Sequence, residues 1–289
     1  MCGNALIAIR SGRARFFQSI VLSSKILLLF PLVALGFFGV FCSVGISIAL
    51  ASIVALYILY RQNIILIPKL DISFLKNAFL FSTGNYFVGL LMTAPSQLLP
   101  ILVLNQLGPE KTAYYYIAFT LANSLSIIPN AVSTSLFVEG SHGENLRSNT
   151  VKSLIAIVIL LVPAITIMFS YGDFILSFFG KDYLAATSLL RVLSLSYLFV
   201  SIVLVYFSVL RVKNNIKGLS LLGGVLFVLL ISSSYFFMMI HGLVGIGYAW
   251  IMTYSLGTVI AILTQSKQIV SLVQRIRGGL HPKEFERLF

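Results

Sequence analysis

The stretch VKSLIAIVILLVPAITIMFS, residues 151–170, contains one charged side chain, Lys152, close to its start. About 20 mostly apolar residues in one helix are enough to cross the hydrocarbon layer of a bilayer. The whole chain of 289 residues repeats this chemistry, since 58% of it is hydrophobic and 10% charged, with a mean hydropathy of +1.00. A soluble domain carries about 25% charged residues. The sequence therefore predicts an all-α, polytopic integral membrane protein.

Long apolar segments of this kind recur along the chain. Lys25 lies near one end of the first segment, where its long stem reaches the headgroups. Pro95 and Pro100 predict a bent helix in the third segment, because proline removes a backbone hydrogen bond. We expect about eight transmembrane helices, over residues 20–38, 40–60, 72–105, 113–137, 151–170, 184–210, 216–240 and 243–265.

The positive charges fall at alternate breaks between these segments. Of the 20 Lys and Arg residues, only Lys111 and Lys181 occupy the opposite breaks, and only Arg191 lies well inside a span. Because positive residues concentrate in cytoplasmic loops, we expect both termini on the cytoplasmic side of a multi-pass protein of the plasma membrane. The net charge of +12 is then explained by anionic membrane lipid, and no nucleic-acid partner is implied.

Groups that would support other chemistry are sparse. Cys2 and Cys42 are far apart, and the three histidines stand in separate loops, so neither a metal site nor a cofactor is expected. The phosphate-binding pattern of an ATP hydrolase does not occur. A membrane glycosyltransferase or polymerase is the enzyme alternative, but the longest predicted outer break, 171–183, is short for such a site. We therefore expect a protein that is not an enzyme.

Six segments of the chain form an ordered series of recognisable motifs. They are residues 36–60, LLPILVLNQLGPE at 98–110, AYYYIAF at 113–119, IPNAVSTSLF at 128–137, EGSH at 139–142 and GLVGIGYAW at 242–250. In this order they resemble the polysaccharide flippases, which export O-antigen-type lipid-linked oligosaccharides and belong to the multidrug/oligosaccharidyl-lipid/polysaccharide superfamily. The resemblance covers nearly the whole chain and rests on the matches in order rather than on one motif.

This resemblance implies a particular domain organisation, because the family has twelve to fourteen helices in two six-helix lobes. Residues 1–65 would be the end of the first lobe, with 3–9 as the end of its fourth helix, followed by helices five and six. Residues 66–270 would form the complete second lobe, and 271–289 a cytoplasmic tail. We therefore expect an N-terminally truncated member of the family, with helices one to three and most of helix four absent.

The implied function is movement of a lipid-linked oligosaccharide, on an undecaprenyl- or dolichyl-diphosphate carrier, across the membrane by rocking of the lobes. The partners would be that substrate, membrane lipid, and either the missing first lobe or a second copy. Two alternatives stay open: a multidrug or cation exporter of the same superfamily, and an inactive truncated remnant.

Polar residues at helical spacing mark two of the predicted spans. The first stripe is Ser82, Asn85, Tyr86, Gly89, Thr93, Ser96 and Gln97, and the second is Thr120, Asn123, Ser126, Asn130, Ser133 and Thr134. Two interpretations stay open, because such stripes either hold helices together or line a wet cavity that accepts sugar hydroxyls. The candidates for a substrate cavity are Asn85, Tyr86, Gln97, Asn123, Asn130 and Arg191.

Arg191 is the one charged residue of the chain placed well inside a predicted span. A charge at mid-membrane costs about 2.5–3.5 kcal/mol on insertion scales. One interpretation is that Arg191 snorkels outward or pairs with Asp182 or Asp173. The other, which depends on the resemblance, is that its guanidinium contacts the substrate diphosphate.

Overall fold

The structure is a computed structural model that describes residues 12–33, 36–61, 72–143 and 145–277, and these residues form helices joined by short turns, with no strand among them. The expected helix end at 3–9 and most of the tail at 271–289 lie outside the described residues. The chain divides into two compact units, Met1–Ile72 and Ser73–Phe289. Each unit is described by itself.

The first unit contains α2 (Gly12–Ser23), α3 (Lys25–Leu32) and α4 (Gly36–Arg61), and both shorter helices pack on α4. The contact face of α4 consists of small residues at every fourth position, namely Gly39, Ser43, Ser47, Ala51 and Ala55, all of them buried. The hydroxyls of Ser43 and Ser47 donate hydrogen bonds to carbonyls of their own helix, at 2.8 Å each. Small residues at this spacing let membrane helices approach closely.

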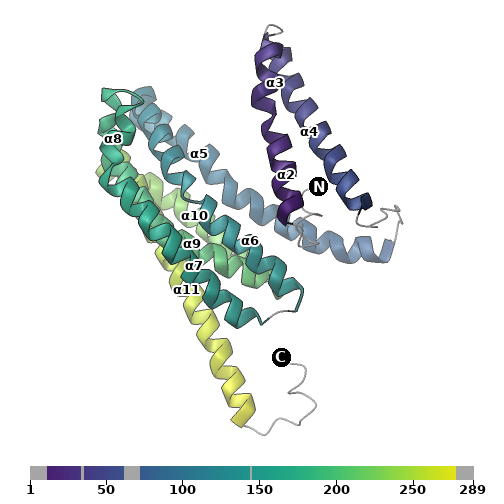
Figure 1. Ribbon diagram of the computed structural model, residues 1–289. Coiled ribbons are helices and arrows are strands. Elements are labelled where there is room, and N and C mark those ends of the chain that lie inside the picture. Colours follow the sequence, from purple (N-terminus) through teal and green to yellow (C-terminus); the bar gives the residue numbers. More distant parts are fainter. Residues whose placement is uncertain (1–11, 34–35, 62–71, 144, 278–289) are drawn as a thin grey trace. The chain divides into compact units, whose positions relative to one another are not determined.

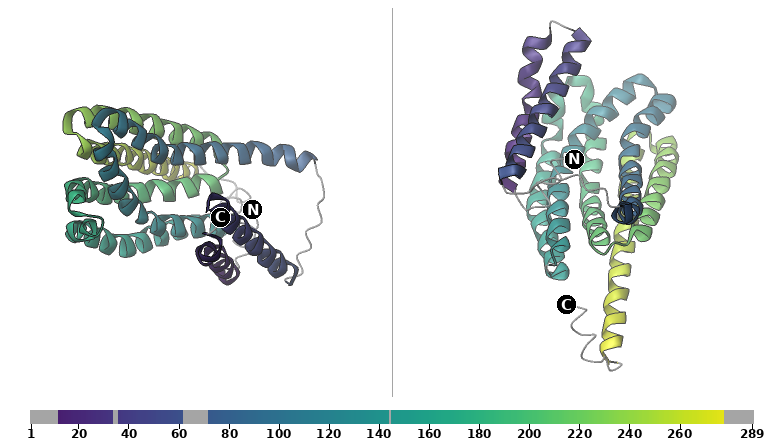
Figure 2. Two further views of the ribbon diagram at one scale, coloured as in Figure 1. Left: turned by 90° about the horizontal axis from the view of Figure 1, so that it is seen from above. Right: turned by 90° about the vertical axis from the view of Figure 1, so that its right-hand side faces the viewer.

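The second unit is a bundle built around one buried helix, α9. Its elements are α5 (Ile72–Ser124), α6 (Ile127–Ser141), α7 (Leu146–Ser170), α8 (Gly172–Ser177), the 3₁₀ helix η2 (Lys181–Ala186), α9 (Thr187–Val212), α10 (Ile216–His241) and α11 (Leu243–Arg277). α9 packs against α6, α7, α10 and α11 and is buried along most of its length (Figure 1). Figure 2 shows α7, α9, α10 and α11 running side by side from two further directions.

α5 contains two helical arms that meet at Gly108. This residue has a left-handed backbone, with φ +84°, and Pro109 follows it. Glycine adopts a positive φ without steric cost, and proline then starts the next helix. The break falls between the predicted spans 72–105 and 113–137, so the two arms of α5 correspond to these two spans.

A second break, between α5 and α6, lies inside the predicted span 113–137. The helix opens at Leu125 and Ser126, four and three residues before Pro129. A proline ring clashes with the carbonyl four residues earlier. In agreement, Ile128 N–H donates to the Leu125 carbonyl in a tighter turn, at 3.4 Å. The predicted span 113–137 is therefore divided between the second arm of α5 and α6, with the bend that a proline inside a span permits.

An aromatic cluster in the core of the second unit ties α5 to α9 and α11. Phe119 stacks on Tyr115 with ring centroids 5.5 Å apart and lies 5.7 Å from Trp250. Trp250 also lies 6.3 Å from Tyr197 and 5.3 Å from Tyr254. These rings are all buried, and such pairs stabilise a core beyond the area that they bury.

Six helices of the described chain are long and apolar enough to cross a membrane, and Phe16–Leu32 is a shorter apolar helix. The count is below the eight predicted spans for two reasons: one of the six contains both arms of α5, and the first predicted span, 20–38, corresponds to the shorter helix Phe16–Leu32. The all-α polytopic fold predicted from composition is confirmed.

Candidate functional site: a polar face on α5 and α6

The second arm of α5 and the following α6 expose a row of polar side chains. We call this row the polar face, and its members are Thr120, Asn123, Asn130 and Thr134, all of them exposed. They recur at steps of three, four and seven residues, which places them on one side of the helical path. The hydroxyl of Thr134 donates to the Asn130 carbonyl one turn earlier, at 2.8 Å. The two asparagine amides are therefore the strongest polar groups of the row.

Asn123 is held in place by α9. Its Oδ1 accepts a hydrogen bond from the hydroxyl of Tyr197 at 2.9 Å, and the Tyr197 ring is buried in the aromatic cluster. This bond uses the carbonyl side of the amide while the residue stays exposed. The bond to Tyr197 thus holds the Asn123 side chain in place, while its remaining polar atoms stay exposed at the surface of the unit.

Asn130 differs from Asn123, because its side chain forms no hydrogen bond with any part of the chain that the structure describes. Its backbone N–H donates to the Ser126 carbonyl at 3.0 Å, so the helix itself is intact at this point. The neighbouring Ser133 faces the other way and is buried, and its carbonyl accepts from the Ser208 hydroxyl of α9 at 2.9 Å. The second stripe predicted from the sequence therefore has a packing side and an open side.

The first arm of α5 contributes three more predicted candidates, Asn85, Tyr86 and Gln97. Tyr86 is 70% exposed and Gln97 is exposed, whereas Asn85 is half-buried. The Asn85 Oδ1 accepts from Nε of Arg211, on α9, at 3.1 Å. Asn85 and Asn123 thus bond to α9 through their side chains, as helix-to-helix contacts would, and Ser133 does so through its backbone carbonyl. Tyr86, Gln97, Thr120 and Asn130 are exposed, and their place in a wet cavity stays a prediction.

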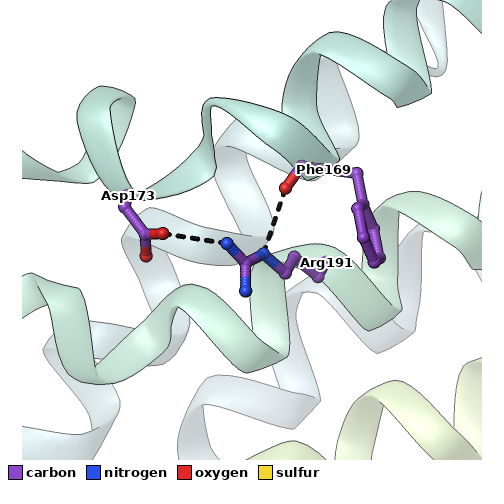
Figure 3. A network of polar contacts seen from close by, with 3 residues as sticks. All are labelled: Phe169, Asp173 and Arg191. Carbon is purple, nitrogen blue, oxygen red and sulfur yellow. Dashed lines mark hydrogen bonds and ion pairs between the residues drawn. The ribbon is translucent and has the colours of Figure 1, made fainter.

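Arg191 lies apart from the polar face, in a contact between α7, α8 and α9 (Figure 3). Its Nη2 donates to Oδ2 of Asp173 at 2.8 Å, and its Nε donates to the Phe169 carbonyl at 3.0 Å. Its guanidinium carbon lies 5.5 Å from the centre of the Phe169 ring. The pairing with Asp173 is the one that one interpretation of the sequence predicts, and it ties Arg191 to α8. The bond to Phe169 ties Arg191 to the last turn of α7.

Two residues that anchor the site have no place among the candidates from sequence. Tyr197 positions Asn123, and Arg211 bonds to Asn85. Their partners stand 74 and 126 residues away along the chain. A tyrosine inside an apolar span is a weak signal for a buried hydroxyl that needs a partner. Arg211 carries a signal only as one of the basic residues that set the topology.

Comparisons with known proteins agree with this architecture. No family model matches the chain. A protein of Shigella flexneri described as "Putative O-antigen transporter" is 24% identical over 225 residues, which cover 73% of this chain and 54% of that protein. The chain thus spans about half the length of this curated relative.

The fold also has a counterpart among solved structures. The crystal structure of a MATE mutant superposes with a TM-score of 0.76 at 14% sequence identity, over 92% of this chain and 63% of that one. The chain thus has weak homology to the O-antigen relative and the fold of the MATE structure, and both of these proteins belong to the multidrug/oligosaccharidyl-lipid/polysaccharide superfamily.

Proposed function

We propose that this chain works in a membrane transporter that moves lipid-linked oligosaccharide or polysaccharide precursors across the plasma membrane by alternating access. The observation that carries this proposal is the polar face on α5 and α6. A multi-sugar headgroup faces a prohibitive cost in hydrocarbon, because each isolated polar group costs about 4–8 kcal/mol there. A row of amides and hydroxyls in a transmembrane region replaces the lost water. The O-antigen relative supports the glycan as the cargo.

Within this proposal, the cavity candidates have different roles. Tyr86, Gln97 and Asn130 are exposed and would contact sugar hydroxyls directly. Asn123 would do so while held by Tyr197. Asn85 would sit at one end of the path, and Arg191 would contribute a charge at the predicted outer end. The rest of the cavity would come from a first lobe or from a second copy of the chain.

The proposal includes the orientation and the absence of catalysis. Both termini would lie in the cytoplasm, because the basic breaks alternate with neutral ones. The carrier would be a polyprenyl diphosphate of the undecaprenyl or dolichyl type, whose tails stay in the bilayer while the headgroup passes. No covalent step is required, so the protein would not be an enzyme.

A multidrug or cation exporter is the second candidate, and the fold likeness to the MATE structure favours it. The two functions differ in what the polar face must bind. Neutral hydrogen-bonding amides suit sugars, whereas a cation needs carboxylates. The described part of the polar face presents amides and hydroxyls, and its closest carboxylate along the helix is Glu139, whose Oε1 accepts from the Ser135 hydroxyl at 3.1 Å.

The test compares strains that lack the gene and carry either the natural chain or a variant. Surface glycan, lipid-linked glycan retained inside the cell, and retention of a cationic dye are measured together. Asn130→Leu should lower surface glycan about fivefold, as expected for the loss of one hydrogen bond of about 1 kcal/mol, and leave dye retention unchanged. Val158→Leu, on the apolar side of α7, is the control. If deletion of the gene changes dye retention but not surface glycan, the chain belongs to a multidrug or cation exporter. If deletion changes neither quantity, the chain is an inactive remnant.

A further inference from the structure

α9 carries two arginines, one near each end, and their surroundings differ. Arg191 has a carboxylate partner, Asp173, at 2.8 Å. Arg211 lies in the last turn of α9, and its Nε donates to the neutral amide oxygen of Asn85 at 3.1 Å. Within the described parts of the chain, the two terminal nitrogens of Arg211 have neither a hydrogen-bond acceptor nor an ion-pair partner. The charge of Arg191 is therefore neutralised by a carboxylate of the protein, whereas Asn85 fixes the orientation of Arg211 without neutralising its charge.

The corner around Arg211 is strongly basic. Lys213 and Lys217 follow within six residues, and the sequence contains no acidic residue between Asp182 and Glu284. Desolvation lowers the pKa of the Lys213 ammonium, so this corner is not fully open to water. Arg211 is itself half-buried, and a partly desolvated guanidinium whose terminal nitrogens have no acceptor among the described residues is costly, which favours an anionic partner.

Among the acidic residues that the structure describes on the packed elements, none pairs with Arg211. The end of α6 packs closely here, since a Cβ on Gly140 would come within 2.8 Å of Val212 Cγ2. Glu139 precedes Gly140, but its Oε1 accepts from Ser135 and lies beyond ion-pair distance of Arg211. Glu144, in the loop after α6, lies outside the described residues.

We propose that Arg211, oriented by Asn85, forms a phosphate-binding site at the Val212 end of α9. A guanidinium is planar, and a bond at Nε leaves its two terminal amino groups side by side for two oxygens of one phosphate. Asn85 is then a positioning residue, because it acts by fixing the plane of the Arg211 guanidinium. Both residues are half-buried and lie on helices, Asn85 on α5 and Arg211 on α9, so the plane of the guanidinium stays fixed.

Two sources could supply this phosphate. One is the headgroup of an anionic lipid in the leaflet at the predicted cytoplasmic end of α9. The other is the diphosphate of a lipid-linked glycan, and this source rests on the proposed function. Asn85 neighbours Tyr86, an exposed cavity candidate, so a phosphate on Arg211 would lie at one end of the proposed glycan path. Both ligands carry a phosphate ester with two non-bridging oxygens.

The sharpest test gives Arg211 a carboxylate partner like the one that Arg191 has at the other end of α9. Asn85→Asp preserves the shape of the side chain but places a carboxylate on Arg211, as Asp173 does on Arg191. Asn214→Asp adds the same charge in the same corner, in the turn after α9, and is the matched control. A second pair of variants changes the cation itself: Arg211→Gln removes it, and Lys217→Gln removes one charge nearby on α10.

The experiment measures binding of two probes to the purified full chain in phosphatidylcholine nanodiscs by native mass spectrometry. The probes are phosphatidylglycerol and undecaprenyl diphosphate. We expect Asn85→Asp and Arg211→Gln to weaken binding about tenfold or more, in line with the loss of charge-assisted hydrogen bonds, and Asn214→Asp and Lys217→Gln to weaken it less than about threefold. Loss with phosphatidylglycerol alone assigns the site to lipid headgroups, and loss with undecaprenyl diphosphate alone assigns it to the carrier.

Two results would overturn the site. Equal weakening by Asn85→Asp and Asn214→Asp would mean that the corner attracts anions only through its net charge. Unchanged binding in both Asn85→Asp and Arg211→Gln would mean that Arg211 has only a packing role. If Arg211→Gln does not fold, Asn85→Asp decides alone, since it keeps the guanidinium and a bond to it. The assay involves no transport, so either result leaves the proposed function to its own test.

Discussion

The exposed faces of two parts of the second unit differ in chemistry although both are open. On α7 and α10 most exposed side chains near mid-span are apolar, among them Val158, Ile159, Val225 and Val228. On α5 and α6 the exposed positions include Thr120, Asn123, Asn130 and Thr134. Lipid tails accept the first surface and penalise the second. The exposed face of α7 and α10 therefore fits lipid, whereas water, a substrate or another protein surface would suit the polar face better.

The difference rests mainly on the amides. Threonine hydroxyls in a helix satisfy themselves against a carbonyl one turn earlier, as Thr134 does, and so tolerate lipid. An amide has two donors and an acceptor with two lone pairs and cannot satisfy all of them in this way. Asn123 has one bond, to Tyr197, and the Asn130 side chain has none within the described residues. Within the polar face, Asn130 is therefore the residue that fits lipid least.

The largest expected effect comes from placing a charge on each face. Val158→Lys puts an ammonium on the lipid-facing side of α7 and should cost about 2.5–3.5 kcal/mol in membrane insertion. Asn130→Lys puts the same group on the polar face, where the cost should be below about 1 kcal/mol if water reaches it. The fraction of chain that resists carbonate extraction measures both. Equal losses at the two positions would contradict the difference between the faces.

Thiol labelling should separate the faces directly. In a chain with Cys2 and Cys42 replaced by serine, Asn130→Cys should react with a membrane-impermeant maleimide about tenfold faster than Val158→Cys. The reason is that the reactive thiolate forms only where water solvates it. Labelling rates in intact vesicles, compared with rates after detergent solubilisation, provide the measurement. A polar face covered by another lobe would react slowly in the membrane and quickly in detergent.

The apolar spans could be predicted from sequence, because burial in lipid depends on composition over about 20 residues. The expected span 216–240 matches α10, Ile216–His241, almost residue for residue. The division of α5 at Gly108 follows from a glycine and a proline in adjacent positions. The opening at Leu125 could have been placed four residues before Pro129, since the ring acts on that carbonyl.

The partners of the polar residues could not be predicted in this way. Periodicity shows which residues share a side of a helix, but it does not show which neighbouring helix they meet. Asn123 and Asn130 stand in one stripe, yet one bonds to Tyr197 and the other stays open. Arg211 is a second example, because only tertiary packing brings it to the amide of Asn85. The carboxylate partner of Arg191, by contrast, was one of two candidates close in sequence.

The smallest expected effect sharpens the comparison at Asn123. Tyr197→Phe removes the hydroxyl that donates to Asn123 Oδ1 and leaves the buried ring in place. If Asn123 faces water, a water molecule replaces the hydroxyl, and the free energy of unfolding in bicelles should fall by about 0.6–1 kcal/mol, the usual value for one bond between membrane helices. Tyr235→Phe, at an exposed position of α10, is the control and should change little. A loss above about 3 kcal/mol would mean that the amide oxygen is left dry, and Asn123 would then belong to the packing of the bundle rather than to a wet path.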